Sequence, residues 1–206
     1  MIVVLDTETT GVSKTDQVIQ LAAFELPDNI TELKSKLALA GFNTPLVRDR
    51  VTSTLFPSLQ VSNRYFNPTV AINEHAFKVH GLSKIKLCKY PTLDVAKLPK
   101  FSLVVAHNAP FDTRMLQLTD VNAICTMGLA KKIEKLRGGK FGFENYQLKT
   151  LYKFFYPEHA DYFNTEYHDA LADCEMCLMI LIALLKEFPF INSLTEVHKY
   201  FWVDNK

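Results

Sequence analysis

Short apolar runs along the chain have the length and composition of buried β-strands. Residues 2–5 (IVVL) and 103–106 (LVVA) are continuous and rich in β-branched side chains, which is typical of strands covered on both faces. Residues 7–11 extend the first run into a hairpin, and Pro27 closes the run that follows. The predicted strands are residues 2–5, 18–26, 59–66, 103–106 and 122–125.

Apolar residues at helical spacing fill most of the remaining chain. Pro110 suits the first turn of a helix that directly follows the strand at 103–106. Gly81 ends an earlier helix, at residues 73–79. We expect helices at residues 28–40, 73–79, 110–118, 126–136, 147–156, 170–187 and 193–202. Strands at the start, then strands alternating with helices, predict an α/β fold with a mixed β-sheet flanked by helices.

The composition is that of a globular protein with a hydrophobic core of its own. Hydrophobic residues make up 48% of the 206 residues and charged residues 22%, and neither a repeat nor a low-complexity linker interrupts the pattern. A chain of this length can fold without disulfides or a structural metal. We therefore expect a single domain over residues 1–206, in which a bound metal would serve catalysis.

The net charge and the cysteines bear on the protein's partners and on its cellular compartment. A net charge of +1 does not by itself indicate a nucleic-acid partner, which would need a local basic patch or metal ions. The cysteines form no disulfide framework, and Cys174 and Cys177 lie in an apolar helical run that favours two buried thiols. No signal peptide precedes the first strand, and the apolar stretch 177–185 is too short to span a bilayer. We expect a reduced, cytoplasmic protein without membrane contact.

Two carboxylates, Asp6 and Glu8, stand one residue apart at the end of the first strand. Because strand side chains alternate, both would project from one face at the centre of the sheet. Like charges placed there need compensation, and a divalent cation is the simplest form of it. The alternative is that the strand has already ended and both acids are solvated, since this spacing often arises by chance.

Three further residues could join this pair. Asp112 lies in the first turn of a helix, where interaction with the helix dipole is a common role for aspartate. His168 precedes the apolar helix 170–187, and Asp173 lies inside it, where an acid needs a partner or a metal. Taken singly, His168 could be a polar cap, and Asp173 could be a solvated position on an amphipathic face.

The combination of these five residues is more informative than any one of them. They stand at strand ends and helix starts, which can converge at the carboxyl edge of a sheet. Four carboxylates suit two hard divalent cations, and a histidine beside them can accept a proton from an attacking water. The sequence therefore predicts a two-metal phosphoryl-transfer site.

Three segments resemble the exonuclease motifs of the DEDD superfamily in its histidine branch. They are residues 4–11 (VLDTETTG), 105–112 (VAHNAPFD) and 167–173 (YHDALAD). The H-x-A-x-x-D form of the third marks the branch that contains the proofreading (epsilon) subunit of bacterial replicative polymerase. Order and spacing also match, and the resemblance extends over residues 1–188. Within the branch, residues 124–127 (ICTM) and the pair Asp173-Cys174 are similar to bacterial exodeoxyribonuclease X enzymes.

The resemblance implies a ribonuclease H-like fold and 3′→5′ hydrolysis of DNA at its 3′ ends. It implies two Mg²⁺ or Mn²⁺ ions, His168 as general base, and as metal ligands the carboxylates of Asp6, Glu8, Asp112 and Asp173. It also implies a pocket for a 3′-terminal nucleotide, with the candidates Thr7, Thr9, His80, Asn108 and Phe111. The acid that contacts nucleotide in the epsilon subunit falls here on His75, with Glu74 beside it.

The segment at about 27–60 departs from the family pattern, in which a tight turn joins the second strand to the third. We interpret it as an insertion that covers the site, binds a partner or decorates the sheet edge. Its irregular part carries Arg48 and Arg50. A surface insertion at a hairpin should be replaceable by a short turn without loss of folding.

Two weaker features also bear on nucleic-acid binding. A basic cluster in the helix 126–136 and just after it is either a solvated helix face or a patch for backbone phosphates; it comprises Lys131, Lys132, Lys135 and Arg137. Several aromatic residues could stack on bases, although their position around a helix favours a core role. They are Tyr146, Tyr152, Phe154, Phe155 and Tyr156.

Four functions compete on this evidence from the sequence. They are a DNA exonuclease for repair, recombination or end trimming, an RNA-trimming or oligonucleotide-degrading enzyme, a polymerase-associated proofreading module, and an inactive binding domain. The presence of all five candidate metal-binding and catalytic residues disfavours the inactive domain. The segment after Phe188 is short and capped like a docked helix, which disfavours a polymerase-binding tail. DNA and RNA both stay open, because recognition of the 2′-OH depends on pocket geometry.

Overall fold

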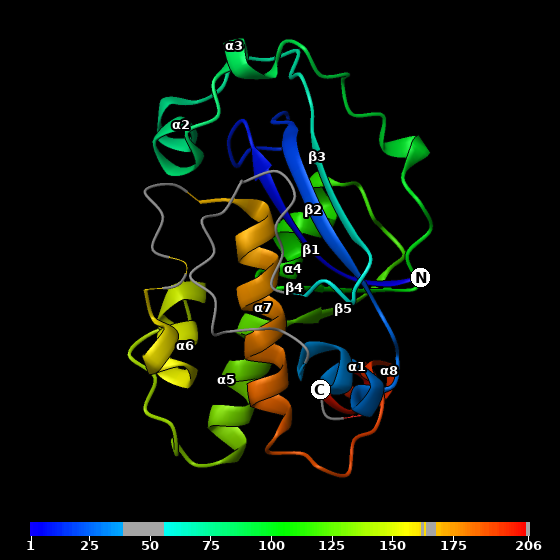
Figure 1. Cartoon of the computed structure of the whole chain (residues 1–206), viewed down its shortest axis with the longest axis vertical. Coiled ribbons are helices and arrows are strands. Elements are labelled where there is room, and N and C mark those ends of the chain that lie inside the picture. The colour runs from blue at the N-terminus through cyan, green and yellow to red at the C-terminus, as the bar shows by residue number, and fades with distance from the viewer. Residues whose placement is uncertain (39–55, 162, 164–167, 205–206) are drawn as a thin grey trace.

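A five-stranded mixed sheet with the strand order β3-β2-β1-β4-β5 forms the centre of the protein (Figure 1). The computed structural model describes residues 1–38, 56–161, 163 and 168–204. β1 (Ile2–Thr9) pairs antiparallel with β2 (Val18–Leu26), which pairs antiparallel with β3 (Val61–Tyr65). β4 (Leu103–Ala106) runs parallel to β1, and β5 (Asn122–Cys125) runs parallel to β4. The predicted fold class, a mixed sheet flanked by helices, is confirmed.

Helices cover both faces of this sheet. α7 (Ala170–Leu185) crosses one face with α5 (Thr126–Leu136) and α6 (Leu148–Phe155) packed beside it, and α4 (Ala109–Met115) lies on the other face (Figure 1). The remaining elements lie at the two ends of the sheet or in its connections. They are α1 (Ile30–Ala38), α2 (Glu74–His80), α3 (Lys84–Leu87), α8 (Leu194–His198), the 3₁₀ helices Val95–Lys97 and Pro157–His159, and the π-helix Lys199–Asp204.

The alternation of side chains along β1 divides the core into two layers. Val4 packs into the cluster that contains α7, whereas Val3 and Leu5 pack into the cluster on the α4 side. The same alternation places Asp6 and Glu8 on the α7 side, where the strand leaves its apolar surroundings. The register with β2 shifts between Glu8 and Thr9, so the ladder becomes irregular where the carboxylates stand.

Most predicted helix boundaries hold because their capping residues act as the sequence indicates. The side chain of Asn73 accepts a hydrogen bond at the start of α2, and Gly81 ends that helix with a φ of 67°. The helix predicted over 110–118 ends earlier, at Met115. Gln117 adopts a φ of 54°, and its N–H and that of the next residue bond back to carbonyls of the last turn. A glutamine gives no sequence signal for this left-handed end, and α3 was likewise not predicted.

The two described ends of the segment 27–60, interpreted from the sequence as a replaceable surface insertion, contribute side chains to the core. Ile30, Leu33, Phe56 and Leu59 are all buried in the core cluster that contains α7. Backbone hydrogen bonds also tie its start to the segment before α8, since Ile30 donates to the carbonyl of Asn192 at 2.9 Å. Residues 39–55, with Arg48 and Arg50, lie outside the described residues.

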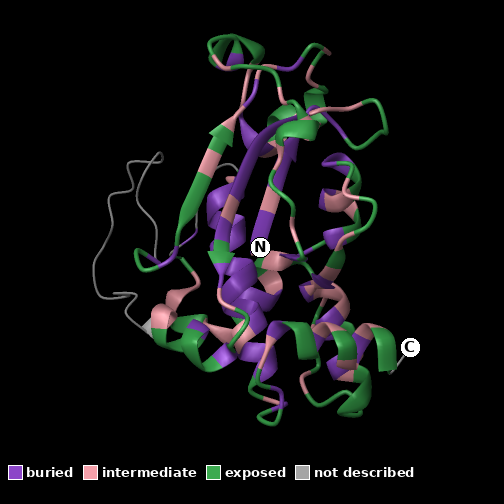
Figure 2. Cartoon of the chain, turned by 90° about the vertical axis from the view of Figure 1, so that its right-hand side faces the viewer, coloured by how far each residue is buried: buried purple, intermediate pink, exposed green. Residues whose placement is uncertain are grey.

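Burial is continuous from the central strands into α7, while β3 is exposed along much of the sheet edge (Figure 2). Cys174 and Cys177 are both buried in α7 as free thiols, as their apolar surroundings in the sequence predicted. Within the described ranges, no helix has the length and apolarity needed to cross a membrane.

Candidate active site

Asp112 is held at the end of β1 by hydrogen bonds from one threonine. The backbone N–H and the hydroxyl of Thr7 both donate to Asp112 Oδ1, at 3.1 Å and 2.8 Å. Thr7 stands between Asp6 and Glu8, so this contact links the α4 carboxylate to the strand that carries the other two. Asp112 is buried, with only 3% of its surface exposed.

His168 and Asp173 reach the same place from the start of α7. His168 Nδ1 lies 3.3 Å from Asp173 Oδ2, and the His168 backbone N–H donates to the carbonyl of Val79. The side chain of Asp169 caps the helix by accepting from the N–H groups of its first turn. His168 is 45% exposed and Asp173 only 8%, so the imidazole stands between the buried carboxylate and solvent.

The carboxylates repel one another in a poorly solvated place. Burial, followed by the charges of Asp112 and Asp173, raises the pKa of Asp6 well above its usual value, and burial with Asp173 raises that of Glu8. Burial also raises the pKa of Asp112 to about 7, although the hydrogen bonds from Thr7 oppose the shift. Such a cluster favours a bound cation, since positive charge removes the repulsion.

The ligand atoms are close enough to share a cation. Oxygen or nitrogen atoms of Glu8, His168 and Asp173 lie within 4.8 Å of one another. Asp6 and Asp112 line the same pocket, which has a volume of about 510 Å³. The structure therefore brings together all five residues that the sequence singled out for metal binding and catalysis.

The exonuclease family model named RNase_T matches residues 3–181, a range that contains these five residues. This chain belongs to the RNase_T exonuclease family. The match confirms the resemblance to the DEDD superfamily that the three sequence motifs carry, and with it the assignment as a nuclease. No curated protein sequence matches the chain.

Several solved structures share the fold of this family member. Exonuclease X in complex with 5′ overhanging duplex DNA matches with a TM-score of 0.61 and 20% identity, covering 96% of this chain and 99% of that one. E. coli exonuclease I in complex with a dA16 oligonucleotide has a TM-score of 0.64 and 15% identity, covering 97% of this chain and 42% of that one. A zinc-bound E. coli exonuclease I–ssDNA complex has a TM-score of 0.63 and 15% identity, over 91% and 41% of the two chains. This chain thus spans about two fifths of the length of exonuclease I. The match to exonuclease X supports the expected likeness to exodeoxyribonuclease X.

A second pocket of about 420 Å³ adjoins these carboxylates, and four of the five predicted nucleotide-binding residues line it. They are Thr7, Thr9, His80 and Phe111. His80 Nδ1 accepts from the N–H of Leu82 at 3.0 Å, so its Nε2–H donates to the carbonyl of Thr9 at 3.2 Å. Burial lowers the pKa of His80, which keeps this neutral tautomer. The fifth residue, Asn108, lines the carboxylate pocket instead.

Glu74, the acid next to His75 in the sequence, does not line that second pocket. His75 lines the pocket, whereas Glu74 pairs with Lys78 on the helix surface at 2.7 Å. Glu74 therefore does not replace the acid that contacts nucleotide in the epsilon subunit.

Sequence reasoning missed the wall of the carboxylate pocket formed by Met127, Gln147 and Lys149. The buried ring of His107 holds part of this wall, because its Nε2–H donates to the carbonyl of Tyr146 at 2.9 Å. Its Nδ1 then accepts from the hydroxyl of Thr126 at 2.9 Å. No local pattern marks these residues, since contacts with His107, which is distant in the sequence, bring them to the site.

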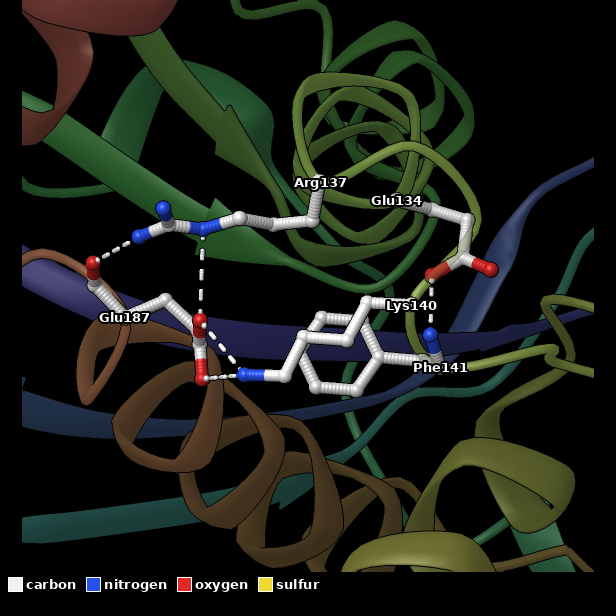
Figure 3. A network of polar contacts seen from close by, with 5 residues as sticks. All are labelled: Glu134, Arg137, Lys140, Phe141 and Glu187. Atoms are coloured by element: carbon white, nitrogen blue, oxygen red, sulfur yellow. Dashed lines mark hydrogen bonds and ion pairs between the residues drawn. The ribbon is translucent and has the colours of Figure 1, made fainter.

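Part of the predicted phosphate patch makes contacts within the chain. Lys132 Nζ donates to the carbonyl of Phe201 at 2.6 Å. Arg137 and Lys140 both pair with Glu187, at 3.2 Å and 3.0 Å (Figure 3). Lys131 and Lys135 are exposed. The cluster is thus divided between groups that join α5 to the C-terminal segments and groups that face solvent.

Proposed function

We propose that this RNase_T family member is a 3′→5′ exodeoxyribonuclease that releases 5′-mononucleotides and depends on two ions of Mg²⁺ or Mn²⁺. The observation that carries the proposal is the convergence of four carboxylates and His168 on one pocket, beside a second pocket of nucleotide size. Exonuclease X and exonuclease I, which share the fold, have been solved with DNA bound. Their ligands favour DNA as the substrate.

Asp6, Glu8, Asp112 and Asp173 would hold the ions. The fit is chemical, because carboxylate oxygens are the preferred ligands of both metals. Burial, and after it the neighbouring carboxylates, raise the pKa of Asp6 and of Glu8, and a bound cation would offset this cost of ionisation. When bound, such ions activate a water for attack on phosphorus and stabilise the oxygen of the leaving strand.

The other residues position the substrate and move the proton. His168 takes a proton from the attacking water at Nε2, while its Nδ1 faces Asp173 Oδ2 and keeps the ring oriented. Thr7 fixes Asp112 through two hydrogen bonds. The terminal nucleotide enters the pocket lined by Thr9, His80 and Phe111, which places the last phosphodiester beside the carboxylates.

The test compares hydrolysis of 5′-labelled single-stranded DNA and RNA of one sequence by the purified protein. We expect DNA to be shortened in Mg²⁺ or Mn²⁺, RNA to be shortened more slowly, and both reactions to stop in excess chelator. Faster loss of RNA would assign the enzyme to RNA trimming. Undiminished hydrolysis in chelator would contradict the use of metal ions.

A further inference from the structure

Half-buried and exposed aromatic rings gather along the connection between α5 and α6 and on α6 itself. Phe143 packs 5.9 Å from Tyr146 and 4.9 Å from Phe154, measured between ring centroids. Phe154 is 45% exposed, so the sequence expectation of a core role holds for the buried Tyr152 but not for Phe154. The chain runs on from Tyr146 to Lys149 at the pocket wall.

Polar contacts hold the connection that carries these rings. The carboxylate of Glu134 accepts from the backbone N–H of Phe141 at 3.1 Å (Figure 3). It also accepts from the backbone N–H of Gly142 at 2.8 Å. Lys140 and Arg137, just before the rings, are both fixed by Glu187 at the end of α7. The rings therefore occupy a defined place on the surface.

Three exposed lysines lie on α5 and α6, the two helices that this connection joins. Lys131 Nζ lies 5.4 Å from the centroid of Tyr146, Lys149 lines the pocket, and Lys153 follows one helical turn later on α6. No described carboxylate forms an ion pair with any of the three. α6 contains no acid, and the exposed Glu144 is the acid in the connection before it. Lys149 and Lys153 repel each other at this spacing, a local cost that an anionic partner would remove.

We propose that this surface, the α5–α6 corner, binds the single-stranded nucleic acid that leads into the active site, a role that rests on the proposed exonuclease function. It is made by Phe143, Tyr146, Phe154, Lys131, Lys149 and Lys153. The bases of the strand stack on the rings, and its phosphates contact the ammonium groups. Aromatic rings interleaved with cations are the usual platform for single strands.

The lysines favour nucleic acid over a protein partner. The cores of protein–protein interfaces are enriched in aromatic residues but depleted in lysine, because its strongly hydrated charge is costly to bury. A phosphate backbone supplies the opposite charge at regular intervals and leaves the ammonium groups partly in water. The corner thus supplies the local positive charge that the net charge of +1 does not.

The test measures binding of fluorescein-labelled dT15 by anisotropy, in chelator so that nothing is cleaved, over a series of salt concentrations. One variant is Phe154→Ala, and the other combines Lys149→Gln with Lys153→Gln. Phe190→Ala removes a ring that is 60% exposed, lies beyond the end of α7 and is not among the residues of the corner, and it serves as the control. Lys34→Gln with Lys100→Gln removes two exposed charges elsewhere. Thermal unfolding shows that each variant is folded.

We expect Phe154→Ala to raise the Kd about fivefold or more, as the loss of one stacking platform does. The lysine pair should reduce the slope of log K against log salt by about 1.4, which corresponds to two phosphate contacts on a single strand. Both control variants should bind like the native protein.

Three results would overturn the assignment. Equal weakening by the control lysine pair would show a general charge effect, and equal weakening for a blunt duplex would remove the single-strand specificity. If the corner variants bind dT15 like the native protein but lose self-association in sedimentation, the corner is a contact between copies of this chain. Because binding is measured without metal, the two proposals fail separately: dT15 binding through the corner without cleavage in Mg²⁺ would contradict only the nuclease function.

Discussion

Asp6, Glu8 and Asp112 have raised pKa values because burial and mutual repulsion disfavour their charged forms. Folding therefore places negative charge where the apo-protein is least able to accept it. The hydrogen bonds from Thr7 reduce the cost at Asp112 without removing it. A site of this kind gives up stability for affinity toward a cation, which is a common trade at functional sites.

This trade predicts a pH-dependent stability in chelator. A carboxyl with a raised pKa keeps its proton in the folded state after the unfolded chain has lost it, so folding loses this advantage as pH rises. For Asp112 the window runs from its usual value of 3.8 to about 7. Thermal unfolding in chelator should therefore give a lower Tm at pH 8 than at pH 6.5, and Mg²⁺ should restore it.

Asp6→Asn should separate stability from activity. The amide removes one charge from the cluster at nearly constant shape, so the variant in chelator at pH 8 should gain about 1 kcal/mol, or about 2–4 °C in Tm. Its nuclease activity should be lost because a metal ligand is weakened. Asp161→Asn, which removes an exposed charge elsewhere, should change neither quantity. A lower Tm for Asp6→Asn would contradict the repulsion inferred at the site.

His168 and Asp173 should differ in what their loss affects. His168→Ala should lose about 10²- to 10⁴-fold in turnover, the usual contribution of a general base, and still bind Mn²⁺. Asp173→Ala should lose metal affinity as well, because a hard cation depends on its carboxylate oxygens. Single-turnover kinetics with calorimetric Mn²⁺ titration measures both. Equal loss of Mn²⁺ affinity in the two variants would make His168 a ligand.

At the scale of elements, α1 and the residues just before β3 contribute to the core. Leu33 is fully buried with Phe56 and Leu59 in the cluster around α7. We expect Leu33→Ala to lower the free energy of unfolding by about 2–5 kcal/mol, as removal of a fully buried leucine does. Leu136→Ala, at a side chain that is 58% exposed, is the control and should cost little. Urea denaturation measures both, and a near-neutral Leu33→Ala would make α1 a surface insertion after all.

The elements that the sequence predicted well are those whose signals are local. β4 is a short apolar run, and α2 begins and ends at recognisable caps, Asn73 and Gly81. The end of α4 was misjudged because Gln117 adopts a left-handed conformation that its type does not announce. The core role of α1 was missed because its partners lie far along the chain, in the residues around Asn192.

The same distinction applies to the site within the whole molecule. Asp6 and Glu8 could be predicted from strand alternation, and Asp112, His168 and Asp173 from motif spacing. The pocket wall at Met127 and Lys149 could not, because it depends on how the α5–α6 connection folds back, held by His107 and Glu134. Packing between distant elements thus determines the surroundings of the reaction, while short motifs supply its chemistry.

The whole molecule is proposed to shorten DNA from a free 3′ end, and one measurement tests this most directly. A single-stranded DNA labelled at its 5′ end is incubated with the protein in Mg²⁺, with either a 3′-hydroxyl or a 3′-phosphate, and its products are resolved by length. We predict a ladder that shortens one nucleotide at a time from the free 3′ end, with release of 5′-mononucleotides, and sharply slower loss of the blocked strand. Equal rates on both strands, with internal fragments as first products, would show an endonuclease and contradict the account.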